Sequence, residues 1–174
     1  MSVGMTAVMR QQIEKEEKRI GEPLETAHEM LAASPGLLTK YFMAAPLFGY
    51  NRAAPADVAA VTRIAALRGE DCGPCVLIGI AYARDAGVAE EHLKRMRQRR
   101  YDDLPHDLSL AANFGDAVAR SLPEVVELGE AVERAWGRAG RVELALAAAT
   151  SRVHPAMKRG LGIARNCAIL DADD

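Results

Sequence analysis

The residues of this chain that could do chemistry are two cysteines separated by two residues, in the tetrapeptide Cys72-Gly73-Pro74-Cys75. Two thiols at this spacing can form a disulfide reversibly or supply two ligands to a metal ion. The 174 residues include 3 cysteines, too few for the disulfide framework of a small secreted protein. We therefore predict thiol redox chemistry at Cys72 and Cys75, with metal binding and simple packing as the alternatives.

The segments around the dithiol predict that it lies at the junction of two helices. An Ala-rich run with apolar residues at steps of three and four begins after Pro55 and stops at Gly69. Nothing before Cys72 has the pattern of a strand, whereas the same tetrapeptide in thioredoxins follows a β-strand. Pro74 favours the first turn of a helix, so Cys75 is expected in that turn and Cys72 just outside it. The helix dipole there stabilises a thiolate.

Two acidic residues, Glu70 and Asp71, come directly before the dithiol. Nearby negative charge raises the pKa of a thiol and so opposes the effect of the helix dipole. A carboxylate that accepts the thiol proton would reconcile the two effects, because it would act as a general base and later return the proton. Glu70 is our candidate for this proton relay, and the alternative is an exposed carboxylate at a helix junction.

The patterns that a metal or a nucleotide cofactor would need are missing. A zinc site requires two ligands besides Cys72 and Cys75, and Cys167 shows no recurring spacing with any histidine. The sequence Gly160-Leu161-Gly162 has neither a preceding strand nor the third glycine of a dinucleotide fingerprint. We therefore expect neither metal nor cofactor, and we interpret Cys167 as a small buried residue.

The elements that must position these residues are predicted to be helices throughout. Hydrophobic residues make up 49% of the chain, and alanine and leucine outnumber the β-branched residues that favour strands. No stretch resembles a long linker, so we expect one all-α domain over residues 1–174. Its expected parts are N-terminal helices forming an oligomer arm (1–50), a helical hairpin with the CxxC (55–100) and C-terminal helices (105–167).

Three segments carry more specific expectations. The apolar run Val76 to Ala86 predicts a central buried helix. Helices are expected to stop at Trp136, to restart at Arg141, and to kink or divide at Pro155. One segment is rich in large apolar side chains, namely Phe42, Met43, Leu47 and Phe48. We interpret this group as core or subunit interface rather than as a cofactor pocket.

Charge and hydropathy argue against two classes of partner. With 22 Lys and Arg against 24 Asp and Glu, the chain lacks the basic excess that phosphate contacts require, so we expect no nucleic-acid partner. The basic cluster Lys94 to Arg100 lies beside Asp102 and Asp103 and is interpreted as a solvated helix face. No apolar run suits a signal peptide or a membrane helix, which favours a cytoplasmic protein without membrane contact.

The setting of the dithiol resembles the alkyl hydroperoxidase D / carboxymuconolactone decarboxylase family. The resemblance rests on Arg63-Ile64-Ala65-Ala66-Leu67, on Glu70-Asp71-Cys72-Gly73-Pro74-Cys75 and on Ala86-Gly87-Val88. It is firmest over residues 55–100 and extends more loosely to Ser151–Gly162. The resemblance implies an AhpD-like helical bundle that assembles as a trimer or hexamer.

In its peroxidase branch, the family reduces small hydroperoxides with the dithiol. The resemblance implies that Cys75 is the peroxidatic cysteine, oxidised to a sulfenic acid, and that Cys72 resolves it as a disulfide. By the logic of thioredoxins the outer residue, Cys72, would be the nucleophile instead. The electron donor implied by the resemblance is a lipoylated protein or another dithiol protein.

The chain departs from the peroxidase pattern at both members of the usual proton relay. The family's histidine, four residues after the second cysteine, is Gly79 here, and its glutamate, twelve residues before the first cysteine, is Ala60. Candidates for a substitute are Glu70, His154 and Tyr82, which shares a helix face with Cys75. Gly79 would leave space for an imidazole from elsewhere, such as that of His154.

The functional prediction is therefore a thiol-dependent peroxidase-like oxidoreductase whose activity is weakened by the missing relay. One alternative is a carboxymuconolactone decarboxylase-like enzyme on the same fold, although that branch generally lacks the dithiol. Another is a non-catalytic protein, either a thiol redox sensor or a structural oligomer.

Overall fold

The computed structural model describes residues 3–164, and every regular element in that range is helical. The predicted all-α class is thus confirmed, while Cys167 and the end of the expected segment 105–167 lie outside the described residues. The chain divides into two compact units, Met1–Gly49 and Tyr50–Asp174. No helix in the described range is both long and apolar enough to cross a membrane.

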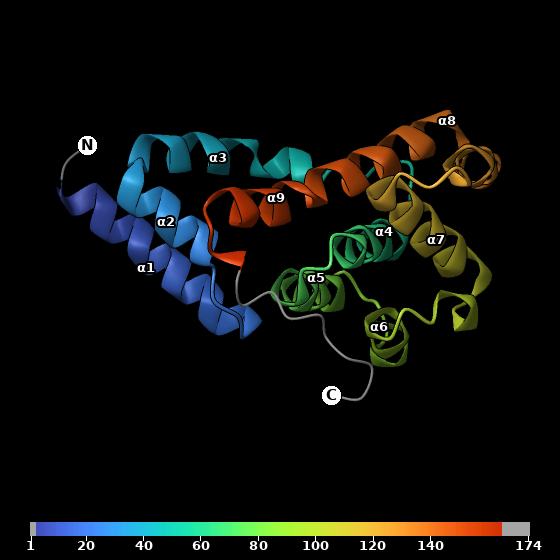
Figure 1. Cartoon of the computed structure of the whole chain (residues 1–174), viewed down its shortest axis with the longest axis horizontal. Coiled ribbons are helices and arrows are strands. Elements are labelled where there is room, and N and C mark those ends of the chain that lie inside the picture. The colour runs from blue at the N-terminus through green and yellow to red at the C-terminus, as the bar shows by residue number, and fades with distance from the viewer. Residues whose placement is uncertain (1–2, 165–174) are drawn as a thin grey trace. The chain divides into compact units, whose positions relative to one another are not determined.

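The first unit consists of α1 (Val3–Ile20), α2 (Glu25–Ala33) and α3 (Pro35–Phe48). Each helix packs against the next along the chain (Figure 1). The Glu17 carboxylate fixes the junction of α1 and α2, because its Oε1 accepts a 2.7 Å hydrogen bond from the Leu24 N–H and lies 3.0 Å from His28 Nε2.

The apolar side chains of α3 are mostly exposed. Leu38 is its buried residue, whereas Leu37, Phe42, Met43 and Leu47 are exposed. The interpretation of Phe42, Met43 and Leu47 as core is therefore wrong for this chain. Their interpretation as a subunit interface remains a prediction.

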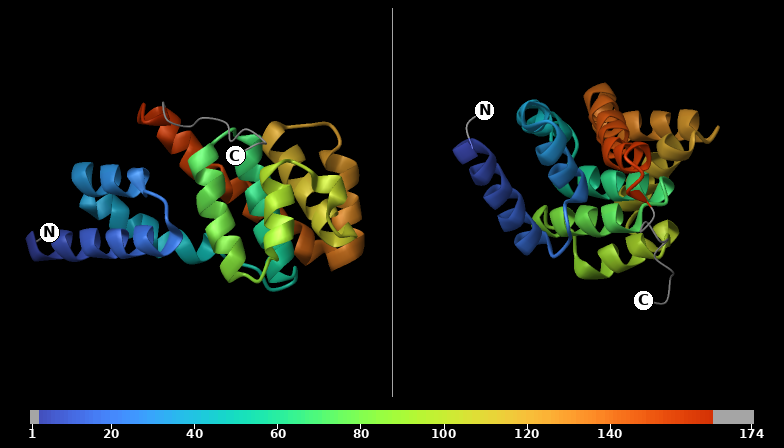
Figure 2. Two further views of the ribbon diagram at one scale, coloured as in Figure 1. Left: turned by 90° about the horizontal axis from the view of Figure 1, so that it is seen from below. Right: turned by 60° about the vertical axis from the view of Figure 1, so that its left-hand side comes forward.

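The second unit contains the dithiol and is built around one central helix. Its elements are α4 (Ala56–Gly69), α5 (Gly73–Asp85), α6 (Glu90–Arg97), a short 3-10 helix η1 (Tyr101–Asp103), α7 (His106–Arg120), α8 (Val125–Ser151) and α9 (Val153–Gly160). Helix α4 packs against α5, α7 and α8 (Figures 1 and 2). The expected central helix over Val76–Ala86 is corrected, because α5 exposes Tyr82, Arg84 and Asp85 whereas α4 is buried over most of its length.

A close backbone approach fixes α4 against α7. A Cβ atom on Gly115 would lie 2.4 Å from the Thr62 carbonyl oxygen, so only glycine fits there. The buried Thr62 hydroxyl donates hydrogen bonds to Val58 O (3.0 Å) and Ala111 O (3.3 Å), which satisfies it between the helices. The position of α4 in turn fixes where the chain leaves it toward the dithiol.

A buried carboxylate anchors the segment that leads into α4. Glu143 of α8 accepts hydrogen bonds at Oε2 from the backbone N–H groups of Arg52 (2.9 Å), Ala53 (2.8 Å) and Ala54 (3.0 Å). Burial raises the pKa of Glu143, but these three hydrogen bonds outweigh it and the pKa is lowered overall. The carboxylate therefore stays ionised at neutral pH and holds the start of α4 to α8.

The breaks expected in the last third of the chain are present. Gly137 has a non-helical backbone (φ 73°, ψ 174°) and interrupts α8, which confirms the predicted break between Trp136 and Arg141. A second break falls at Arg152, and Pro155 is the third residue of α9. Proline is tolerated in this first turn, because the N–H that it lacks would have no helical partner there.

A candidate redox site at the start of α5

Cys72 and Cys75 form a disulfide across the start of α5, with their Cα atoms 5.3 Å apart. Cys72 is the residue before the helix and has an extended backbone, whereas Cys75 is the third helical residue. This confirms the predicted placement of the two cysteines, with Pro74 as the second residue of the helix rather than the first. Both cysteines are buried.

A tight turn brings the chain from α4 to the disulfide. The Asp71 N–H donates to the Arg68 carbonyl (3.1 Å), and Asp71 adopts a left-handed backbone with φ 51°. Asp and Asn are the non-glycine residues that tolerate this conformation best. The chain therefore reverses within two residues, and the last residue before this reversal, Glu70, remains next to the dithiol.

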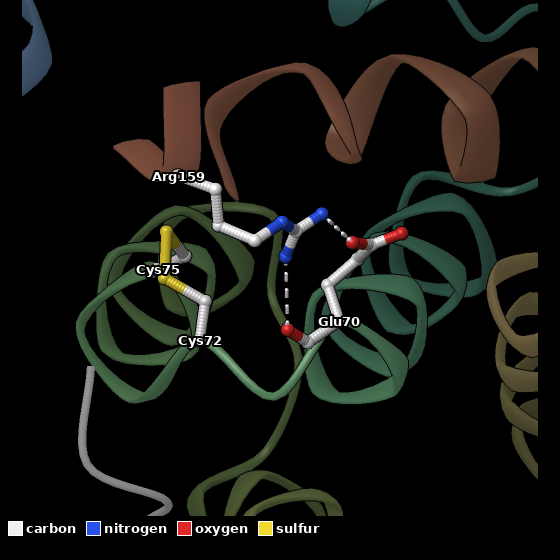
Figure 3. The surroundings of a disulfide bond; sticks show 4 residues. All are labelled: Glu70, Cys72, Cys75 and Arg159. Carbon is white, nitrogen blue, oxygen red and sulfur yellow. Dashed lines mark hydrogen bonds and ion pairs between the residues drawn. A yellow bond between two sulfur atoms is a disulfide. The ribbon is translucent and has the colours of Figure 1, made fainter. Parts of the chain in front are cut away.

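Glu70 is held by two arginines from the far end of the chain. Arg152 Nε donates to Glu70 Oε1, and Arg159 Nη2 donates to Oε2. Arg159 Nη1 also donates to the Glu70 carbonyl oxygen (3.4 Å), as Figure 3 shows. The Glu70 side chain is 7% exposed, against 41% for Arg152 and 51% for Arg159. The alternative interpretation of Glu70 as an exposed carboxylate is therefore wrong.

The electrostatics of Glu70 favour a permanent negative charge. Burial raises the pKa of Glu70, but hydrogen bonds and charges from Arg159 and Arg152 lower it more, so the pKa lies below its usual range. A carboxylate in this state binds a proton weakly, which makes it a poor general base near neutral pH. Arg152, Arg159 and Glu70 together carry one net positive charge, and Asp71 adds a separate negative charge next to Cys72.

Arg159 brings positive charge to the edge of the dithiol site. Figure 3 shows the Arg159 side chain extending from α9 to Glu70, which precedes Cys72 by two residues. Guanidinium groups carry their charge at any physiological pH. Arg159 therefore carries its charge on a residue two positions before Cys72, and positive charge near a thiol favours the thiolate once the disulfide is reduced.

The space expected at Gly79 is filled. A Cβ atom there would lie 2.8 Å from Leu67 Cδ1 and 3.5 Å from Ile64 Cγ1, because α4 and α5 pack closely at this point. The expectation that an imidazole from elsewhere could occupy this position is thus wrong. Ala60, the other substituted relay position, is buried in α4.

The two remaining candidates lie on different helices. His154 is the second residue of α9, where burial and the nearby Lys158 charge lower its pKa, so that the imidazole is neutral at neutral pH. Tyr82 lies on α5 and is exposed. Their roles at the dithiol stay predictions.

Sequence reasoning missed Arg152 and Arg159, although both belong to the C-terminal stretch that carries the looser resemblance. They lie seven positions apart, a spacing that places two side chains on one helix face and could have suggested a paired role. Their common partner, however, lies 82 and 89 residues earlier in the chain.

Comparison with known proteins gives no relative from which the role of this site could be inferred. No protein family, curated protein or solved structure matches the chain. Within residues 3–164, no group of three or more His, Cys, Asp and Glu side chains could hold a metal ion. The features that remain are a buried dithiol pair, a helix start and a pair of arginines on one carboxylate.

Proposed function

We propose that the chain is a thiol-dependent peroxidase that reduces small hydroperoxides with Cys72 and Cys75. The observation that carries the proposal is the disulfide-bonded pair at the first turn of α5, next to the arginine-bound Glu70. The likeness of this segment to the alkyl hydroperoxidase D family supports the same reaction. The CxxC also speaks against the decarboxylase branch, which generally lacks it.

The proposed reaction begins from the reduced dithiol. The Cys75 thiolate attacks the outer oxygen of the hydroperoxide and the O–O bond breaks, which gives Cys75 sulfenic acid and an alkoxide that takes a proton to become the alcohol. The Cys72 thiol then attacks the sulfenic sulfur and releases water as the disulfide forms. A dithiol donor, a lipoylated protein in our proposal, reduces the disulfide and is itself oxidised to a disulfide.

Arg152 and Arg159 can replace one task of the missing Glu and His relay, which is to favour the thiolate form of the nucleophilic cysteine. Positive charge near Cys75 stabilises its thiolate, so less help from a general base is needed to generate the nucleophile. A guanidinium group is a poor proton donor, so the leaving alkoxide must take its proton from another source. Because general acid–base catalysis contributes about 10²–10⁴ in rate, we expect turnover slower than that of an enzyme with a full relay.

We further propose that the protein acts as a homo-oligomer, a trimer or hexamer by resemblance. The exposed apolar side chains of α3 support this proposal, because apolar patches that remain exposed commonly mark interaction surfaces. Light scattering on the purified protein would measure the subunit count. Replacement of Met43 and Leu47 by Glu is expected to yield monomers, and an unchanged mass would contradict α3 as the interface.

Stopped-flow mixing of the reduced protein with cumene hydroperoxide tests the function. The expected result is rapid loss of two thiols per chain, with continued turnover when dithiothreitol is supplied. Cys75→Ser should abolish the reaction, Cys72→Ser should leave a sulfenic acid that a dimedone probe labels, and the matched control Cys167→Ser should react like the wild type. Slow thiol loss without turnover would instead support a redox sensor, and inert thiols would contradict both redox functions.

A further inference from the structure

We propose that Arg159 binds a carboxylate on the substrate, so that the preferred hydroperoxide is anionic. This inference rests on the proposed peroxidase function and names its substrate class. It starts from the charge imbalance at the site, where Arg152 and Arg159 share one carboxylate. A second carboxylate would complete the pairing.

Within the group of Arg152, Arg159 and Glu70, the arginines are the accessible members. Glu70 is almost fully buried, whereas half of the Arg159 side chain is exposed. Among the described residues, Arg159 donates to Glu70 through Nη1 and Nη2, which leaves some of its five N–H donors for a group arriving from solvent. Planar guanidinium groups bind carboxylates well, and those of Arg152 and Arg159 both donate hydrogen bonds to the Glu70 carboxylate.

The position of Arg159 connects this anion site to the reacting sulfur. Its guanidinium binds Glu70, two residues before Cys72, so a carboxylate on its outer side lies at the edge of the dithiol site (Figure 3). An apolar side chain, Leu161, is exposed two residues after Arg159. A ligand with an apolar body, a carboxylate and a hydroperoxide suits these features better than hydrogen peroxide, which offers only the last of the three.

Two hydroperoxides that differ in one group provide the test. The probes are cumene hydroperoxide and its para-carboxylate, compared by kcat/KM with dithiothreitol as reductant at low ionic strength. We expect the carboxylate to be preferred by about tenfold, as a charge-assisted hydrogen bond is worth about 1.4 kcal/mol or more. The ratio of the two kcat/KM values should fall toward one in Arg159→Gln. Arg159→Lys should retain part of the preference, because it keeps the positive charge. Added salt should weaken it.

The ratio of the two substrates is the decisive quantity, because Arg159→Gln also weakens thiolate formation and slows both reactions. Arg141→Gln is the matched control, since Arg141 is 38% exposed and pairs with Glu133 on α8. It should leave the ratio unchanged. Equal turnover of both probes by the wild type would overturn the carboxylate site and leave the peroxidase standing. Thiols inert to both probes would overturn the two proposals together.

Discussion

The two ends of α4 are each held by a buried glutamate, and the two glutamates are held in different ways. Before α4, Glu143 accepts three hydrogen bonds from consecutive backbone N–H groups. After α4, Glu70 accepts hydrogen bonds from the side chains of Arg152 and Arg159. Both carboxylates have lowered pKa values, so both are charged at neutral pH.

The difference lies in what the partners can do. Backbone N–H groups keep their positions as long as the fold persists, so the Glu143 contacts can only stabilise structure. Arginine side chains that are about half exposed can exchange a carboxylate for another anion or a thiolate without unfolding. The partners of Glu143 are fixed and those of Glu70 can be exchanged, so we expect changes at Glu143 to affect stability and changes at Glu70 to affect the dithiol.

The largest expected effect is on stability at the Glu143 end. Glu143→Ala leaves three backbone N–H groups without their acceptor, and we expect the free energy of unfolding to fall by about 3 kcal/mol. Urea denaturation followed by circular dichroism would measure it. Glu70→Ala is the matched variant and should cost about 1 kcal/mol, because the freed guanidinium groups can be hydrated. A larger loss for Glu70→Ala would reverse the comparison.

The next largest effect is on chemistry at the Glu70 end. Glu70→Gln removes a negative charge beside the dithiol and leaves both arginines positive, so more of the Cys75 thiol should ionise. We expect up to about tenfold faster thiol oxidation below the pKa of the thiol, read from a pH–rate profile. If Glu70 were the general base, the rate would instead fall by about 10²–10⁴. Glu143→Gln is the control and should leave the profile unchanged.

The comparison also shows which parts of the molecule the sequence could predict. Periodicity together with Pro55 and Gly69 located α4, and Pro74 located the first turn of α5, because these signals act within a few residues. Glu70 could be singled out as close to the dithiol for the same local reason. Its arginine partners could not, since they lie more than 80 residues away and meet it only in the folded chain.

Helix packing is the second feature that the sequence could not predict. Thr62 is a polar residue that α4 buries, and the acceptors of its hydroxyl, Val58 O and Ala111 O, lie on α4 and α7. Gly79 could mean a gap or a close helix contact, and only the position of Leu67 decides between them. Local sequence patterns therefore predict the helices and turns. Which helix is central depends on contacts with helices that are distant in the sequence.

A smaller expected difference between Glu143 and Glu70 is how their contributions to stability depend on pH and salt. Each has a folded-state pKa below its ordinary value of 4.5, so its stabilising contribution is present above that pH and is lost as the pH falls through the lowered pKa. We expect Glu143→Gln and Glu70→Gln each to reduce this acid-induced loss in urea denaturation. Salt at about 0.5 M should screen the exposed arginines and remove the Glu70 part of the loss. The Glu143 part should persist, and an equal response of both would contradict the distinction.

The smallest effect concerns Asp71, which sets the direction in which the chain leaves Glu70. Its left-handed backbone (φ 51°) suits glycine better than any residue with a Cβ atom. Asp71→Gly should therefore be more stable than Asp71→Ala by about 1 kcal/mol, the opposite of their order inside a helix. Both variants lose the same charge, so their thiol oxidation rates should match while their urea midpoints differ. Equal midpoints would mean that the turn is not held in this conformation, and the place of Glu70 beside the dithiol would then have to come from Arg152 and Arg159 alone.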